Sequence, residues 1–293
     1  MGMQLCFDAT RFGCGLAAAV ELAAAKALTA VEFTFQPFPV AGRSARTLAR
    51  QEERYLGQIA ALCRDMQVEI VVLNLDFCLQ PLEKRSAAYF EAMVARLARV
   101  CSLTGCQRLS FALEPAAGPG WSEAAEQVLN QALGSCAQAE VKPLLRLGTA
   151  HAHHGQSLRD WRPLNPDDWR AVLAGCPGLS LSFSPADCVW QGIDYLKILP
   201  AMVPAIEHIA ANDVEINREL IADAGLFGPL WWRYRLVGKG QVDWRQLVEA
   251  LKLYDYAGSF SIHLDDEFVN GDLSELGQAL DASISFLAPL LRG

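Results

Sequence analysis

Short apolar runs alternate with longer segments of helical periodicity along the whole chain. The short run QLCF is read as a strand, and AVEFTF has the β-branched and aromatic residues of one. VEIVVLNL is nearly continuous in apolar character, which is typical of a strand covered on both faces. Residues 44–66, in contrast, repeat apolar positions every three or four residues, as an amphipathic helix does. The expected strands are residues 4–7, 30–35, 68–75, 107–113, 141–147, 179–183, 205–211 and 258–263.

Helical segments separate these strands. The expected helices cover residues 15–28, 44–66, 83–104, 122–138, 166–174, 191–203, 215–224, 243–254 and 272–291. Strands that alternate with helices predict a parallel sheet, and a chain of this length predicts that the sheet closes into a (β/α)8 barrel. No shift in composition marks a linker, so we expect one domain over residues 1–293.

A glycine pattern near the N-terminus offers a competing interpretation. Gly13, Gly15 and Ala18 form G-x-G-x-x-A, and Glu32 follows at about the distance of a ribose-binding acid in a dinucleotide fold. The residues DATRF separate the first strand from Gly13, however, so the tight strand-to-helix turn of that fold is missing. The barrel accounts for the whole chain, and we prefer it.

Composition narrows the range of partners. The 293 residues carry a net charge of −8 and a sequence pI near 5.2, which argues against nucleic acid or an anionic membrane. The N-terminus lacks the pattern of a signal peptide, and no apolar stretch reaches the roughly 18 residues of a membrane span. The nine cysteines form no C-x-x-C pair and are typical of buried apolar residues in a reducing compartment. We therefore expect a cytoplasmic protein.

Four motifs in the second half of the chain point to a family. They are LSFSPADCVWQGID, HIAANDVEIN, WWRYRLVGKGQVDW and YAGSFSIHLDDE. These resemble the patterns LNFDPSHLVWQGID, HVHAKDTEIN, an arginine-rich loop that ends in GxGxVDW, and YDGxLSIEHED. The chain is thereby similar to the sugar-phosphate isomerases and epimerases of the xylose isomerase-like TIM-barrel superfamily. The resemblance implies a (β/α)8 barrel that isomerises or epimerises a sugar, sugar phosphate or polyol.

The resemblance also implies a divalent metal (Mn, Mg, Co or Zn), held by Glu, Asp, His and Glu at the ends of strands five to eight. In this chain those positions fall on Arg146 (or Gly148 in the other register), Ser184, Ala210 and His263. Of these residues only His263 has a side chain that binds metals strongly, and Mg²⁺ and Mn²⁺ prefer several carboxylate oxygens as ligands. We therefore expect no cofactor, and isomerase activity that is weak or lost.

Other side chains remain candidates for a carbohydrate site at the C-terminal ends of the strands, where barrels of this kind bind ligands. Arg146 cannot lose its charge, so pairing with Asp187 or Asp213 would leave a fixed cation in place of the metal. The catalytic candidates are Asp187, His208 and His263. The substrate-binding candidates are Glu32, Arg146, Trp190, Asp213 and Arg235, with a weaker claim for Glu114.

Some residues that match the family motifs have a structural explanation. Asp243 precedes a helix and is expected to cap it. Gly238 and Gly240 are expected to serve a turn that needs positive φ. Trp190 and Trp232 could form the wall of a sugar site or pack in the interior.

Two further interpretations stay open. His151, His153 and His154 could combine with His263 and Asp187 in a rebuilt zinc site. Alternatively, the chain could be a non-catalytic partner subunit of an active homologue, or form a homo-oligomer. The expected ligand is small and carbohydrate-like.

Overall fold

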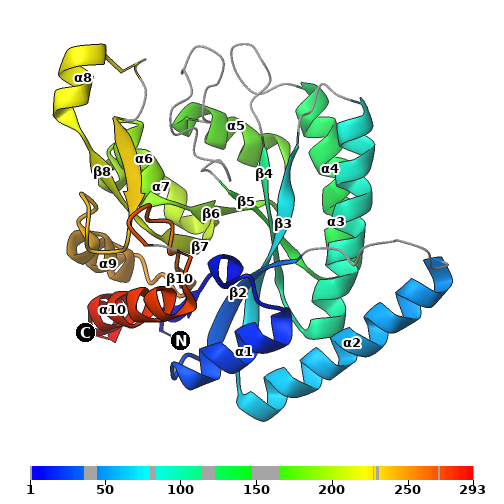
Figure 1. Cartoon of the computed structure of the whole chain (residues 1–293). Coiled ribbons are helices and arrows are strands. Elements are labelled where there is room, and N and C mark those ends of the chain that lie inside the picture. The colour runs from blue at the N-terminus through cyan, green and yellow to red at the C-terminus, as the bar shows by residue number, and fades with distance from the viewer. Residues whose placement is uncertain are drawn as a thin grey trace.

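The computed structural model describes residues 2–35, 45–79, 84–113, 123–146, 165–226, 228, 231–269 and 271–292. Eight parallel strands lie in the order β1-β10-β7-β6-β5-β4-β3-β2. A parallel bridge between Asp8 and Glu32 joins the two edge strands, so the sheet curves into a nearly closed barrel with helices around it (Figure 1). The predicted (β/α)8 barrel is confirmed.

All the predicted strands are present. Their ends agree with the sequence within about one residue, except that the third strand extends four residues further. The bounds are β1 Gln4–Phe7, β2 Ala30–Phe35, β3 Glu69–Leu79, β4 Arg108–Leu113, β5 Lys142–Arg146, β6 Ser180–Phe183, β7 Ile206–Ala211 and β10 Ser259–Ile262.

The helices cover the outside of the barrel. They are α1 Leu16–Ala25, α2 Ala45–Met66, α3 Lys84–Thr104, α4 Glu123–Gln138, α5 Pro166–Gly175, α6 Pro185–Trp190, α7 Tyr195–Met202, α8 Arg218–Ala224, α9 Trp244–Leu253 and α10 Leu273–Arg292. Two short 3-10 turns, Thr10–Phe12 and Val203–Ala205, complete the set in the described part of the chain.

The segment after β6 differs from the prediction of one helix over residues 191–203. It forms two helices, because two separate caps are present. The side chain of Ser184 accepts a hydrogen bond from the backbone N–H of Asp187, and Pro185 occupies the first turn of α6. Both features favour the start of a helix. Asp194 then caps α7 by accepting the N–H of Lys197.

A two-stranded hairpin, which the sequence did not predict, projects from the barrel after β7. Its strands, β8 Asp213–Ile216 and β9 Trp232–Arg235, pair antiparallel. The helix expected over 215–224 therefore starts only at Arg218, since Asn217 caps it after β8 ends. In Figure 1 this hairpin and α8 stand at one side of the barrel.

Apolar side chains fill the space between strands and helices and also the base of the barrel. Large buried residues such as Trp169, Trp244 and Phe260 belong to the outer core. Inside the barrel a small apolar cluster closes the base; it contains Cys6, Ala30, Val71, Val72 and Leu144.

The next inward-facing positions of these strands are polar. Side chains two residues apart on a strand share a face, so Asp8, Glu32, Asn74 and Arg146 follow the apolar cluster toward the C-terminal end. The barrel therefore changes from an apolar base to a polar mouth, where ligand sites of this fold lie. Within the described ranges, none of the helices combines the length and the apolar character that crossing a membrane requires.

Candidate ligand site at the C-terminal end of the barrel

Glu32 lies at the centre of the polar interior, between two histidines. Its Oε2 is 3.0 Å from Nε2 of His208 and 3.1 Å from Nε2 of His263. Glu32 comes from β2, His208 from β7, and His263 directly follows β10. Glu32 and His208 are 1% and 0% exposed, respectively, so the contact is shielded from water. Three residues that the sequence singled out separately therefore meet in one cluster.

Polar neighbours fix the orientation of this cluster. The side-chain amide of Asn74 donates to Oε1 of Glu32 at 2.6 Å. Nδ1 of His208 lies 2.6 Å from the hydroxyl of Ser259, and Nδ1 of His263 lies 3.9 Å from Asp265. Such outer contacts decide which nitrogen of each ring faces the centre.

The charges of the cluster depend on each other. Burial acts to raise the pKa of Glu32, but the charges of His263 and His208 hold that pKa well below its usual range. Burial opposes the charge of His263, yet Glu32 and Asp8 raise the pKa of His263 to about 10. Burial and the charge of Glu32 raise the pKa of Asp8 to about 6. In the absence of any other cation, an imidazolium and a carboxylate thus balance each other here.

At the positions that the motif resemblance assigns to the family's metal ligands, the side chains do not fit that metal. Ser184 caps α6, and its hydroxyl also lies 3.4 Å from Oδ1 of Asn212. Ala210 offers no ligand atom, and Arg146 donates from Nη2 to the backbone carbonyl of Leu75 at 2.9 Å. Since only His263 can ligate, a hard cation would find too few oxygens at these positions.

Asp187 is buried on the first turn of α6. Its Oδ1 accepts the indole N–H of Trp190 at 3.0 Å and the hydroxyl of Tyr234. Burial raises the pKa of Asp187 above its ordinary value. The carboxylate therefore links α6 to β9, and its role as a catalytic residue stays a prediction.

Asp213, a predicted substrate contact, anchors the turn after β9. Its Oδ1 accepts the backbone N–H groups of Val214 and Val242, both at 2.9 Å. Its Oδ2 accepts the N–H of Gly238 and the indole N–H of Trp244, both at 3.1 Å. The side chain is fully buried, and instead of the expected pairing with Arg146 it accepts one hydrogen bond within β8 and three from the turn and α9.

The two glycines of the turn have different roles. Gly238 has a φ of 80°, as predicted. Gly240, in contrast, is not among the residues with positive φ. A Cβ atom there would lie 2.4 Å from Oδ1 of Asp213, so it is the close approach that requires glycine. Asp243 caps α9 as predicted, by accepting the N–H of Gln246.

Arg235 belongs to a charged network on the hairpin. Its side chain pairs with Glu215, and its Nε lies 3.1 Å from Asp266. Arg233 pairs with the same Glu215 at 2.8 Å, and both guanidinium groups lie over the ring of Phe268. The described contacts of Arg235 therefore hold the hairpin against the segment after β10.

Trp190 and Trp232 stack on each other. Their ring centroids are 4.6 Å apart and the interplanar angle is 3°. Trp190 is 5% exposed and Trp232 is 6% exposed, so each covers one face of the other. Packing accounts for these contacts, and a role for Trp190 in binding a sugar stays a prediction.

Comparison with known proteins decides the family. The model of the family described as xylose isomerase-like TIM barrel matches residues 20–290. The chain belongs to this family. A xylose isomerase domain protein from Planctomyces limnophilus has a similar structure, with a TM-score of 0.72 and 15% identity over 99% of this chain and 98% of that one. D-psicose 3-epimerase from Clostridium cellulolyticum, solved with D-tagatose, gives a TM-score of 0.68 and 11% identity over 99% of each chain.

A curated relative matches only a part of this barrel. The uncharacterized protein YfiH of Bacillus subtilis is 29% identical over 113 residues, which cover 35% of this chain and 36% of YfiH. The chain thus aligns with about a third of that protein. The solved structures are too distant in sequence to show more than the shared fold, but the predicted superfamily is confirmed.

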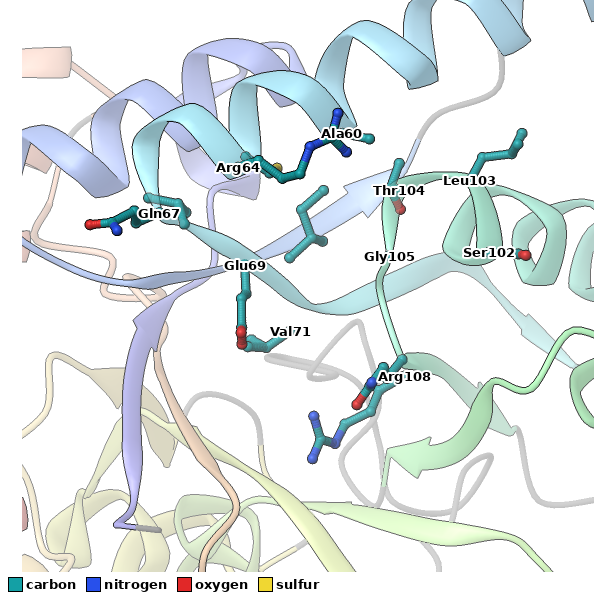
Figure 2. A pocket seen from close by; sticks show the side chains of 14 residues that line it. Ala60, Arg64, Gln67, Glu69, Val71, Ser102, Leu103, Thr104, Gly105 and Arg108 are labelled. Carbon is teal, nitrogen blue, oxygen red and sulfur yellow. The ribbon is translucent and has the colours of Figure 1, made fainter.

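Two cavities lie away from the polar interior of this xylose isomerase-like barrel. One, of about 680 Å³, is at the N-terminal end, where α2 leads into β3 and α3 into β4; Figure 2 shows Gln67, Glu69 and Arg108 around it. The other, of about 800 Å³, lies beside the hairpin and is lined by Trp190, Ile216 and other residues. In this fold the N-terminal end generally serves stability, so the C-terminal interior is the better candidate for chemistry.

Some predicted residues cannot be placed, and some neighbours were missed. Gly148, Glu114 and the histidines at 151, 153 and 154 lie outside the described residues.

The contributions of Asn74, Ser259 and Asp8 to the cluster around Glu32 were not predicted. Asn74 and Asp8 are polar residues on, or directly after, a mainly apolar strand, and this pattern could have drawn attention to them. Ser259 shares its strand with Ser261 and gave no such signal.

Proposed function

We propose that this protein binds a sugar, sugar phosphate or polyol at the C-terminal end of its barrel, without a metal at the family's four-ligand position. Isomerase or epimerase activity is weak or lost. The observation that carries the proposal is a polar barrel interior in which Arg146, Ser184 and Ala210 stand where the family has metal ligands.

The interior offers hydrogen-bonding groups that suit a hydroxyl-rich ligand. Oδ1 of Asn74 and Oγ of Ser110 are buried and have no hydrogen-bond partner among the described residues. Buried polar atoms of this kind are normally satisfied by water or by a ligand. A hydroxyl group can donate to one such atom and accept from another, so polyols match this lining.

Loss of activity follows from the substituted positions. Moving a proton between adjacent carbons needs a base next to the substrate, together with polarisation of the carbonyl oxygen. The family's carboxylate after strand five is replaced by Arg146, which cannot accept a proton at any physiological pH. The carboxylate after strand eight is replaced by His263, which contacts Glu32 instead.

Ligand-induced stabilisation tests the binding. Thermal unfolding would be followed with D-tagatose, a hexose phosphate and a linear polyol. A ligand at 100 times its Kd should add about 2.7 kcal/mol to the free energy of unfolding. Ala210→Phe should abolish the shift, because Ala210 shares the inner face of β7 with His208 and a phenyl ring would block the mouth.

Ala18→Phe is the matched control, since Ala18 lies on the exposed face of α1. This variant should keep the full ligand-induced shift. If no compound stabilises the wild-type protein, or if Ala210→Phe responds as strongly as Ala18→Phe, the mouth is not the binding site.

A further inference from the structure

Three of the four positions that the resemblance assigns to the family's metal carry no good ligand, but the fourth, His263, meets two other ligand side chains inside the barrel. We propose that Glu32, His208 and His263 form a binding site for a divalent transition metal of the zinc class. His208 precedes Ala210 by two residues on β7, so it points into the same interior, closer to the apolar base. This site goes beyond the carbohydrate-binding function and does not depend on it.

The spacing of the donor atoms suits a small cation. One ligand atom from each of the three residues lies within 4.8 Å of the others, and Oε2 of Glu32 is 3.0 and 3.1 Å from the two Nε2 atoms. Donor atoms around tetrahedral zinc, with bonds of about 2.0–2.1 Å, are about 3.3 Å apart. The two contacts with Glu32 are thus close to that spacing, whereas the two imidazoles, whose ligand atoms lie within 4.8 Å of each other, would have to move toward the ion.

The types of donor select the class of metal. Two imidazoles and one carboxylate are the protein ligands of many catalytic zinc sites and of non-haem iron sites. Magnesium and calcium prefer shells made of oxygen and would gain only one carboxylate from these residues. The three residues therefore suit a borderline metal rather than the hard cations.

Neighbouring side chains hold the proposed ligands in place. Asn74 holds the second oxygen of Glu32, and Ser259 contacts Nδ1 of His208 at 2.6 Å. When Nδ1 donates to Ser259, Nε2 of His208 presents a lone pair to the Glu32 carboxylate. In that tautomer a cation between Nε2 and Oε2 of Glu32, which are 3.0 Å apart, would satisfy both acceptors; in the other tautomer Nε2–H donates to Glu32. Such outer partners orient histidine and carboxylate ligands in known metal sites.

Access and charge are also compatible with an ion. The side chains of His208 and Glu32 are 0% and 2% exposed, whereas that of His263 is 17% exposed, so the cluster is open on the His263 side. A metal would displace the proton from His263, and the ion's charge would then face Glu32 in place of the imidazolium. Water would complete the coordination on the open side.

Metal uptake tests the site directly. The protein would be purified without chelator, incubated with Zn²⁺ or Co²⁺ in turn, desalted and analysed for metal content. The wild-type protein should retain about one equivalent, and bound Co²⁺ should show the absorption of a tetrahedral complex. Glu32→Gln and His263→Gln should each weaken zinc binding by at least 100-fold, because each removes a ligand. Ser259→Ala, which changes only an outer contact, should weaken it by about 10-fold to 100-fold.

The control variant changes His151, His153 and His154 to Gln and should bind zinc as the wild type does. Retention of less than a tenth of an equivalent by the wild-type protein would overturn the proposal. So would loss of zinc from the control variant together with full retention by Glu32→Gln. Should Glu32→Gln fail to fold, Ser259→Ala and the cobalt spectrum of the wild-type protein still decide. Metal content is measured without any sugar, so its outcome is separate from that of the carbohydrate test.

Discussion

At the scale of single residues, a buried carboxylate is what organises the interior. Glu32 accepts from Asn74 and contacts both histidines, and it is almost completely removed from water. A buried charge is tolerated only when its partners compensate the loss of hydration. The three contacts therefore depend on one another, and removal of the charge should affect the fold as well as any ligand.

Glu32→Gln should lower the free energy of unfolding of the metal-free protein by about 3 kcal/mol, because His263 then loses its counter-charge in a buried place. Urea denaturation in the presence of chelator measures the change. Glu21→Gln, on the exposed side of α1, should stay within about 0.5 kcal/mol of the wild type. Equal stabilities of the two variants would show that the cluster contributes little to the fold.

At the scale of elements, the hairpin and its turn are what distinguish this barrel from a plain alternation of strands and helices. Asp213 begins β8 and receives one hydrogen bond from its neighbour Val214 and three from the turn after β9 and from α9. Arg233 and Arg235 tie β9 to Glu215 on β8. The hairpin is thus fastened at its base by Asp213 and along its length by ion pairs.

Gly240→Ala should destabilise the protein by about 2–3 kcal/mol, since the added Cβ would lie 2.4 Å from both Oδ1 of Asp213 and the carbonyl of Val214. Gly57→Ala is the matched control. Gly57 lies on the exposed side of α2 with no atom within 4 Å of the added Cβ, so this change should stabilise by up to about 1 kcal/mol. Denaturant titrations of both variants measure the contrast, and a neutral Gly240→Ala would mean that the turn can move away.

An element could be predicted when its own residues show the pattern of a strand or helix, and was missed when it forms only through contacts with another segment or is too short to show a period. Both β2 and β7 are rich in apolar residues and lie between helical segments, so they were predicted without error larger than one residue. β9 was missed because WRYR has no such run and becomes a strand only by pairing with β8. The helix α6 was missed because its six residues are too few for a helical period to show.

At the scale of the whole molecule, the barrel brings together residues that lie far apart in the sequence. Glu32, His208 and His263 were each recognised as candidates, but their contacts depend on strand register and on closure between β1 and β2. Neither can be read from a local pattern. Conversely, the family motifs correctly located Ser184 at the end of β6 and His263 at the end of β10.

The retained scaffold allows a test of the whole assignment, by restoration of the family's metal site. The variant Arg146→Glu, Ser184→Asp, Ala210→His and His263→Glu places the four family ligands on the ends of β5, β6, β7 and β10. Asp at 184 keeps the cap of α6, and position 210 faces inward beside Ser261 of β10. The folded variant should bind Mn²⁺ at micromolar concentration, about −8 kcal/mol, measured by titration calorimetry.

The matched control for this restoration retains Arg146 and carries only the other three changes. It should bind Mn²⁺ far more weakly, because a guanidinium that donates to Leu75 from the inner face of β5 repels the ion and supplies no ligand. If the variant with all four substitutions folds but takes up no Mn²⁺ at millimolar concentration, the barrel assignment and the assignment of the ligand positions have different outcomes. The barrel would stand, since it rests on the strand pairing and on the family match, but the correspondence of residues 146, 184, 210 and 263 with the family's ligands would be wrong.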